Sequence, residues 1–216
     1  MNSTKLLVTA LLGFIINVGS AQNYSAELGY ASDYFYRGAL KSEEAVQASF
    51  GAKTQVGGFD VGAKAFTNQA VDAGSDSYQL NLCVGKSLGD LVSVYGGLNH
   101  FEDVAGEALF EAKVGLGFDT LLSPSVNVYR SFEDDLYTFE AGLNHQFDFE
   151  VAELCVHASA GNTDLTEATD SDYYAFGSKV SRDLAENASV AISADRVDSD
   201  LIDSEWVFGL SVSTNF

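Results

Sequence analysis

The sequence predicts an all-β fold, a transmembrane antiparallel up-and-down β-barrel of about twelve strands. Apolar and polar residues alternate with a period of two along almost the whole chain after residue 21, as in strands with two unlike faces. The composition holds 20 Gly, 15 Phe and 10 Tyr but only 1 Pro, which suits strands that must all pair with neighbours. The third observation is an export signal at the N-terminus.

Residues 1–21 have the pattern of a cleaved signal peptide. Lys5 supplies a positive charge, Leu6 to Ile16 form an apolar run, and Gly19-Ser20-Ala21 provide small residues for cleavage. The run is too short for a convincing membrane-spanning helix. We therefore expect residues 22–216 to form the mature domain, an exported barrel in the cell outer membrane in contact with its lipid.

Twelve segments of the mature chain follow the period-two rule. In the sixth, for example, Phe110 and Val114 alternate with Glu111 and Lys113, whereas the fifth has a weaker pattern and the seventh is short. In chain order the segments are 24–37, 45–56, 59–67, 77–88, 91–101, 108–119, 125–132, 137–147, 149–160, 173–182, 188–196 and 205–216. An even number of strands is typical of single-chain bacterial barrels.

The connections between these segments alternate in kind. Compact turns are expected at 57–58, 89–90, 119–124, 148 and 183–187. Polar, mostly acidic links are expected at 39–44, 68–76, 102–107, 133–135, 162–172 and 198–204. With both termini in the periplasm, every compact turn falls there and every acidic link falls outside, as in outer-membrane barrels. No acidic link has the spacing of a calcium loop, so we interpret them as solvated surface.

The charge and the reactive residues exclude several functions. The net charge is −20 and the pI is about 4.1, which argues against nucleic-acid binding. His100, His145 and His157 show no metal-ligand spacing, and no catalytic set stands out, so we predict neither a cofactor nor an enzyme. Cys83 and Cys155 could form a disulfide in an oxidising compartment, but the predicted strand order places them on opposite sides of the lumen. Free thiols and an error in the register both remain open.

The face opposite the lipid carries charges of both signs. Its predicted pore-lining residues are Glu27, Asp33, Arg37, Lys53, Lys64, Glu111, Lys113, Glu140 and Lys179. One interpretation is a hydrated pore whose polar lining selects solutes. The other is a network of ion pairs that closes a narrow barrel, with Tyr95, Tyr129 and Tyr173 filling the space left by glycines. Asp33 and Arg37 are predicted to form an ion pair near the extracellular rim.

Aromatic residues gather near the ends of the predicted strands. They are Tyr24, Tyr34, Tyr36, Tyr78, Phe118, Tyr137, Phe147, Tyr174 and Trp206. We interpret them as the two interfacial girdles of a membrane barrel; the alternative is the core of a soluble β-sandwich. Phe216 ends a period-two strand, as in substrates of the barrel-assembly machinery, which we expect to be a partner.

Ser32-Asp33-Tyr34-Phe35-Tyr36-Arg37-Gly38 resembles the S-D-Y-x-x-R-G signature of the TorF-type porins of the outer membrane. The continuation, Ala39 to Ser42, departs from the usual pattern. The resemblance implies a porin barrel and names no substrate. We therefore predict passive diffusion of small polar solutes, with a preference for cations set by the acidic links. The alternative is a non-conducting structural or adhesive barrel.

Overall fold

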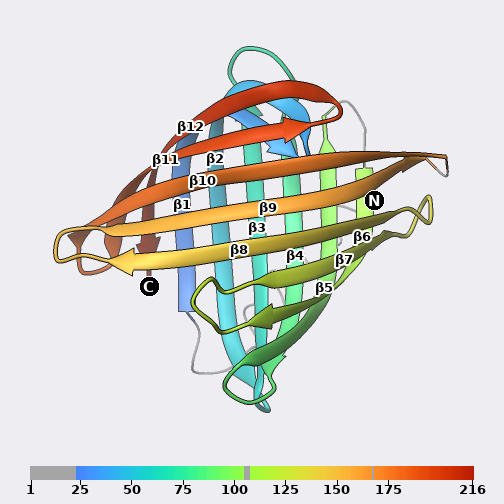
Figure 1. Cartoon of the computed structure of the whole chain (residues 1–216). Helices are drawn as coiled ribbons and strands as arrows, with labels where there is room; N and C mark the ends of the chain where they lie inside the picture. The colour runs from blue at the N-terminus through green and yellow to red at the C-terminus, as the bar shows by residue number, and fades with distance from the viewer. Residues whose placement is uncertain (1–22, 105–107, 167) are drawn as a thin grey trace, which may run out of the picture.

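The computed structural model describes residues 23–104, 108–166 and 168–216, which form twelve antiparallel strands in one closed barrel (Figure 1). The strands are β1 (Asn23–Tyr36), β2 (Ala39–Val56), β3 (Phe59–Ala70), β4 (Ser77–Ser87), β5 (Val92–Asp103), β6 (Ala108–Phe118), β7 (Ser125–Ser131), β8 (Tyr137–Asp148), β9 (Glu153–Thr166), β10 (Thr169–Ala185), β11 (Ala188–Ser199) and β12 (Ile202–Asn215). The predicted fold class is confirmed. The predicted signal peptide lies outside the described residues.

Each strand pairs with its neighbours in the chain, and β1 pairs with β12 to close the barrel. At this seam the Tyr24 N–H donates to the Phe216 carbonyl at 2.8 Å, and the Phe216 N–H donates back at 3.0 Å. The two rings stack with centroids 5.9 Å apart. In Figure 1, β8, β9 and β10 cross in front of β2, β3 and β4, as the near and far walls of a barrel with tilted strands do.

The two faces of each strand have the polarity of a membrane barrel. On β12, Trp206, Phe208 and Leu210 point outward and are 47%, 56% and 52% exposed, while Gly209 and Ser211, which alternate with them, line the interior. The same alternation repeats around the barrel, so the outside is apolar and the inside polar. This distribution excludes the soluble sandwich, which needs an apolar core. The described residues contain no helix long and apolar enough to cross a membrane.

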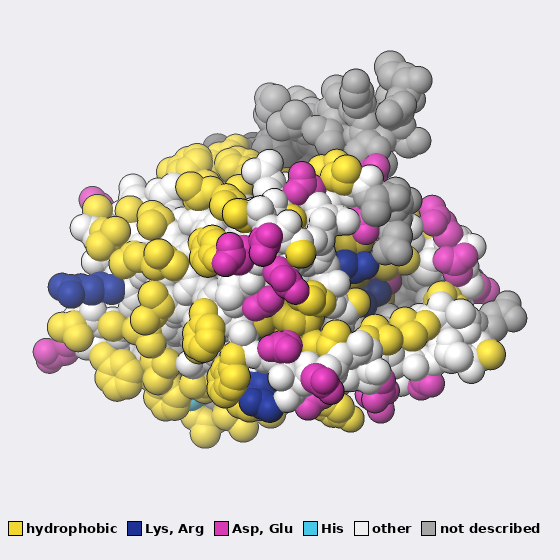
Figure 2. Space-filling view, turned by 90° about the horizontal axis from the view of Figure 1, so that it is seen from above, with side chains coloured by type: hydrophobic (Ala, Val, Ile, Leu, Met, Phe, Trp, Pro, Cys, Tyr) yellow, Lys and Arg dark blue, Asp and Glu magenta, His cyan; other side chains and the backbone are white. Residues whose placement is uncertain are grey.

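The two ends of the barrel differ. The end at which β1 begins and β12 finishes is here called the terminal end. It has compact turns at 57–58, 88–91, 119–124, 149–152 and 186–187, close to the prediction. The opposite, far end carries most of the acidic segments. The links predicted at 133–135 and over most of 68–76 are connections, but the one predicted at 162–172 is largely paired strand: β9 and β10 still pair at Asp164 and Asp170. The predicted link 39–44 is strand as well, and the first turn is only Arg37-Gly38. Figure 2 shows acidic side chains toward its centre and right, and hydrophobic ones over the left.

The first hairpin contains a switch in side-chain parity. Ala31 pairs with Ala45, and both are buried; Ser42, only three residues before Ala45, is buried too, and Glu44 between them has a φ of 46°. The register is unchanged from Ala31–Ala45 to Tyr34–Ser42, so both strands exchange their inward and outward faces together here. The shift in register, a β-bulge, follows between Tyr34 and Phe35, where the partner changes from Ser42 to Leu40. The β1–β12 pairing stops at Ala31, and residues 32–44, the hairpin tip, extend beyond it.

Candidate functional site

The barrel interior is the candidate site, and it is divided into a filled far half and an open terminal half. The hairpin tip fills the far half. Arg37, at its apex, reaches Glu111 on β6, which lies on the opposite wall of the barrel. Its Nη1 and Nη2 atoms donate to Oε1 and Oε2 of Glu111, both at 2.5 Å, and the side chains are 12% and 3% exposed. A planar guanidinium matches a carboxylate in this two-point geometry, so the pair fixes the position of the tip.

Aromatic rings surround the guanidinium. The Arg37 Cζ lies 4.6 Å from the centroid of the Tyr129 ring and 5.0 Å from that of Tyr36. Tyr36 in turn stacks on Phe101 of β5 with centroids 4.5 Å apart, and Tyr34 tilts against Phe66 of β3. Cation–π contacts and ring packing therefore add to the ion pair and exclude water from the far half.

The turn itself requires glycine. Arg37 and Gly38 have φ values of 53° and 77°, as the two central residues of a type I′ hairpin turn do. The Gly38 carbonyl accepts a hydrogen bond from the Ser199 hydroxyl at 2.8 Å. A Cβ at Gly38 would lie 2.7 Å from the Tyr173 Cβ and 2.8 Å from the Ser199 Cβ, so only glycine permits this approach.

Glu140 of β8 collects hydrogen bonds below the tip. It accepts from the Tyr173 hydroxyl at 3.0 Å, from Asn127 Nδ2 at 3.3 Å and from the Tyr129 hydroxyl at 3.5 Å. The Tyr173 ring lies over Gly161, its direct cross-strand partner on β9, where a Cβ would come within 2.2 Å of the ring. Tyr173 thus fills the space left by Gly161, as expected for a narrow barrel that is closed by its own side chains.

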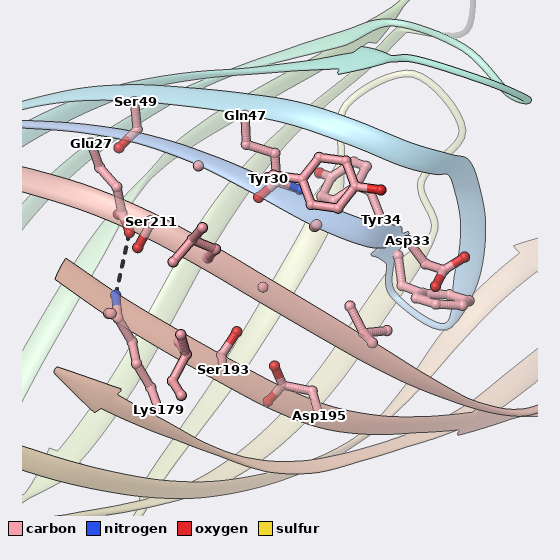
Figure 3. A pocket seen from close by; sticks show the side chains of 18 of the residues that line it. Glu27, Tyr30, Asp33, Tyr34, Gln47, Ser49, Lys179, Ser193, Asp195 and Ser211 are labelled. Carbon is pink, nitrogen blue, oxygen red and sulfur yellow. Dashed lines mark hydrogen bonds and ion pairs between the residues drawn. The ribbon is translucent and has the colours of Figure 1, made fainter.

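A polar cavity of about 440 Å³ lies beside the tip, lined mainly by β1–β3 and β9–β12 (Figure 3). Lys179 Nζ donates to Glu27 Oε1 at 3.3 Å across it, next to Ser211. Asp195 lies 2.7 Å from His157 Nε2 and packs directly over Gly177, where a Cβ would be 1.8 Å from the carboxylate. Hydroxyl groups and fixed charges of both signs make this cavity hydrophilic.

The terminal half contains a larger cavity of about 780 Å³. Lys53 of β2, Lys113 of β6, Cys83 and Tyr95 are among its lining residues. Lys113 Nζ lies over two rings, 5.4 Å from the centroid of Tyr95 and 5.1 Å from that of Tyr129. The interior is therefore open and polar toward the terminal end, and closed by the hairpin tip toward the far end.

The predicted pore-lining residues lie in the interior. Glu27, Asp33, Lys64 and Lys179 line the polar cavity beside the tip, Lys53 and Lys113 line the terminal cavity, and Arg37, Glu111 and Glu140 lie in the far half. Asp33 accepts a hydrogen bond from Ser32 at 2.8 Å. The predicted Asp33–Arg37 pair does not form, because Arg37 binds Glu111 instead. The parity switch in the hairpin tip moves Tyr34 and Tyr36, predicted for the aromatic girdle, into the interior.

Sequence reasoning missed the His157–Asp195 contact and the partner of Arg37. The alternation of residues already placed His157 inward on β9, but its partner two strands away gave no sequence signal. Cys83 and Cys155 are free thiols on β4 and β9. Among the described residues no group of three or more His, Cys, Asp or Glu side chains could hold a metal ion.

No protein-family model matches the chain, and no curated protein matches its sequence. Several solved structures share its fold. The structure described as "KdgM porin" has a TM-score of 0.60 at 10% identity, covering 89% of this chain and 99% of that one. An outer membrane channel from Pseudomonas putida F1 has a TM-score of 0.61 at 7% identity, covering 92% and 96%. The NanC porin has a TM-score of 0.58 at 12% identity, covering 88% and 98%.

At these identities the likeness establishes the architecture, which is that of porin-like barrels of the bacterial outer membrane. The narrower resemblance of residues 32–38 to the TorF-type porins stays a prediction. What the structure adds is a physical role for that motif. It forms the bulge, the inward tyrosines and the Arg37-Gly38 turn of the hairpin tip.

Proposed function

We propose that the protein is an outer-membrane porin through which small polar solutes diffuse passively, and that the hairpin tip sets the width of the passage. One observation carries the proposal. Open, polar cavities line the interior from the terminal end up to a single closure, whose far contact is the Arg37–Glu111 pair. Solutes that pass must therefore pass beside the tip or displace it.

The orientation follows from the outer-membrane architecture, with the terminal end in the periplasm and the acidic far end outside. Acidic residues such as Glu43, Asp164 and Asp170 at the far end attract cations electrostatically, which supports a cation preference at the outer mouth. The outward apolar band contacts lipid. The final strand, ending at Phe216, is proposed as the segment that the barrel-assembly machinery recognises.

Single-channel conductance of the refolded mature protein in a planar bilayer tests this function. We expect small, discrete steps for the wild type and larger steps for Arg37→Ala, because the tip loses its contact with β6. Arg130→Ala is the matched control: Arg130 pairs with Asp135 at the exposed far end, and its removal should leave the steps unchanged. Under a salt gradient, a cation-selective reversal potential would support the proposed preference.

The second candidate function is a non-conducting structural or adhesive barrel. The observation that favours it is the buried far half, in which Glu111, Thr138 and Ser171 are almost inaccessible. A protein that folds, shows heat-dependent gel mobility and conducts neither as wild type nor as Arg37→Ala would overturn the porin and support this alternative.

A further inference from the structure

We propose that the terminal half of the interior is an anion-binding vestibule, in which Lys53 and Lys113 receive a solute that bears a carboxylate or phosphate group. The inference rests on the proposed function only in that a solute must be able to enter this end. The solute proposed here is an anion, whereas the acidic outer mouth attracts cations. The observation behind it is the unequal pairing of acidic and basic groups inside the barrel.

The interior carboxylates that face the two cavities and the tip have donors. Glu27 receives Lys179, Asp195 contacts His157, Glu111 holds Arg37, and Glu140 accepts three hydrogen bonds. At the terminal end Asp60 accepts from Gln55 Nε2 at 2.7 Å. A carboxylate that already accepts strong hydrogen bonds attracts further cations weakly.

Two interior lysines at the terminal end lack such partners. Among the described residues, no carboxylate lies within ion-pair distance of Lys53 or Lys113. The ammonium of Lys113 faces the rings of Tyr95 and Tyr129. Glu140 also acts on Lys113 electrostatically, but it lies beyond ion-pair distance and already accepts three hydrogen bonds. An ammonium without an ion-pair partner in a confined space favours an anionic solute.

The register adds positive charge beside Lys53. Lys53 is opposite Gly62, and Lys64 is opposite Gly51, so the two lysines are diagonal neighbours on β2 and β3. Lys64 itself lines the polar cavity beside the tip. Lys113 approaches from β6 and lines the terminal cavity together with Lys53. Like charges near one another disfavour the empty barrel, and a bound anion would offset that cost.

Cys83 is a native reporter for the potential in this vestibule. Its thiol is exposed, lines the same cavity as Lys53 and Lys113, and lies within electrostatic range of Lys113. We would replace the other thiol (Cys155→Ser), refold the barrel in detergent, and measure rates of Cys83 modification by negatively and positively charged methanethiosulfonates at low salt. This measurement works whether or not the barrel conducts, so its failure is distinct from that of the proposed passage.

We expect the negative reagent to be favoured relative to its preference for a free cysteine. Removing one charge with Lys53→Gln or Lys113→Gln should lower the ratio of rates on the order of fivefold, and high salt should abolish the effect. Inorganic phosphate should slow the labelling of Cys83 in the parent protein, which carries Cys155→Ser alone. It should not slow labelling in the same protein with both Lys53→Gln and Lys113→Gln. Arg182→Gln is the matched control, because Arg182 is an exposed basic residue on β10 near the same end and is not among the residues that line the cavity.

Two results would overturn the proposal. One is a ratio of negative-reagent to positive-reagent rates that equals the ratio for free cysteine, or that neither Lys53→Gln nor Lys113→Gln changes. The other is labelling that is indifferent to phosphate. Heat-dependent gel mobility confirms that each variant is folded before its rates are compared.

Discussion

The two halves of the interior are lined by the same strands, yet they differ in whether their charged side chains are paired. In the far half, Arg37 and Glu111 are buried against each other and Glu140 is saturated with donors. In the terminal half, Lys53 and Lys113 line an open cavity and have no ion-pair partner among the described residues. The difference comes from one hairpin tip, which supplies the far half with the side chains that complete its packing. The wall of a barrel alone therefore does not determine whether its lumen is filled.

The largest expected effect comes from Glu111→Ala in the filled half. It leaves the Arg37 guanidinium buried without its partner, which should lower the free energy of unfolding by about 3–5 kcal/mol. Urea unfolding in lipid vesicles measures it. The control is Asp135→Ala, which breaks the exposed Arg130 pair and should cost less than about 1 kcal/mol. Equal losses for the two variants would mean that the far half is hydrated and the contrast between the halves is false.

A smaller effect is expected at the turns, where the two ends of the barrel can be compared directly. Gly38→Ala meets Tyr173 and Ser199 as well as an unfavourable φ, and should cost about 2–4 kcal/mol in unfolding free energy. Gly57→Ala, at the terminal end, has a φ of 60° but nothing within 4 Å, so only the backbone strain of about 1 kcal/mol remains. The same unfolding assay separates them; a Gly38 variant as stable as the Gly57 variant would show that the tip is not tightly packed.

The smallest effect is expected for a single hydroxyl. Tyr173→Phe removes the donor at 3.0 Å from Glu140, but Asn127 and Tyr129 remain, so the loss should be about 1 kcal/mol. Tyr174→Phe, on the exposed outer face of the same strand, should change the unfolding free energy by much less. If Tyr174→Phe proves the more costly variant, the hydroxyls at the lipid interface matter more than those of the interior.

The wall of the barrel could be predicted from the sequence because the residues of each strand alternate between its apolar and its polar face. All twelve strands and the compact turns at the terminal end follow from the period-two pattern and the turn residues, with errors of a few residues at the ends. The acidic segments misled the prediction of loops, because strands that extend beyond the lipid lose their apolar outer face while keeping their hydrogen bonds.

The contents of the lumen could not be predicted in the same way. Both strands of the hairpin tip change parity next to Glu44, and nothing local distinguishes this change from a continuing strand. The period-two pattern therefore predicts Tyr34 and Tyr36 outside, whereas both lie inside. The partner of Arg37 lies on the sixth strand, and only the closed shape of the barrel brings Glu111 within reach.

The contact between Arg37 and Glu111 also constrains the order of assembly. The first hairpin can form locally and early, but its arginine has no acceptor until the sixth strand has joined the sheet and the wall has curved round to face it. Before that moment the far half is a water-filled trough, and each of its charges is solvated. We therefore expect the far half to lose its water late, once the wall has curved, and the Arg37–Glu111 contact to slow the reopening of a completed barrel.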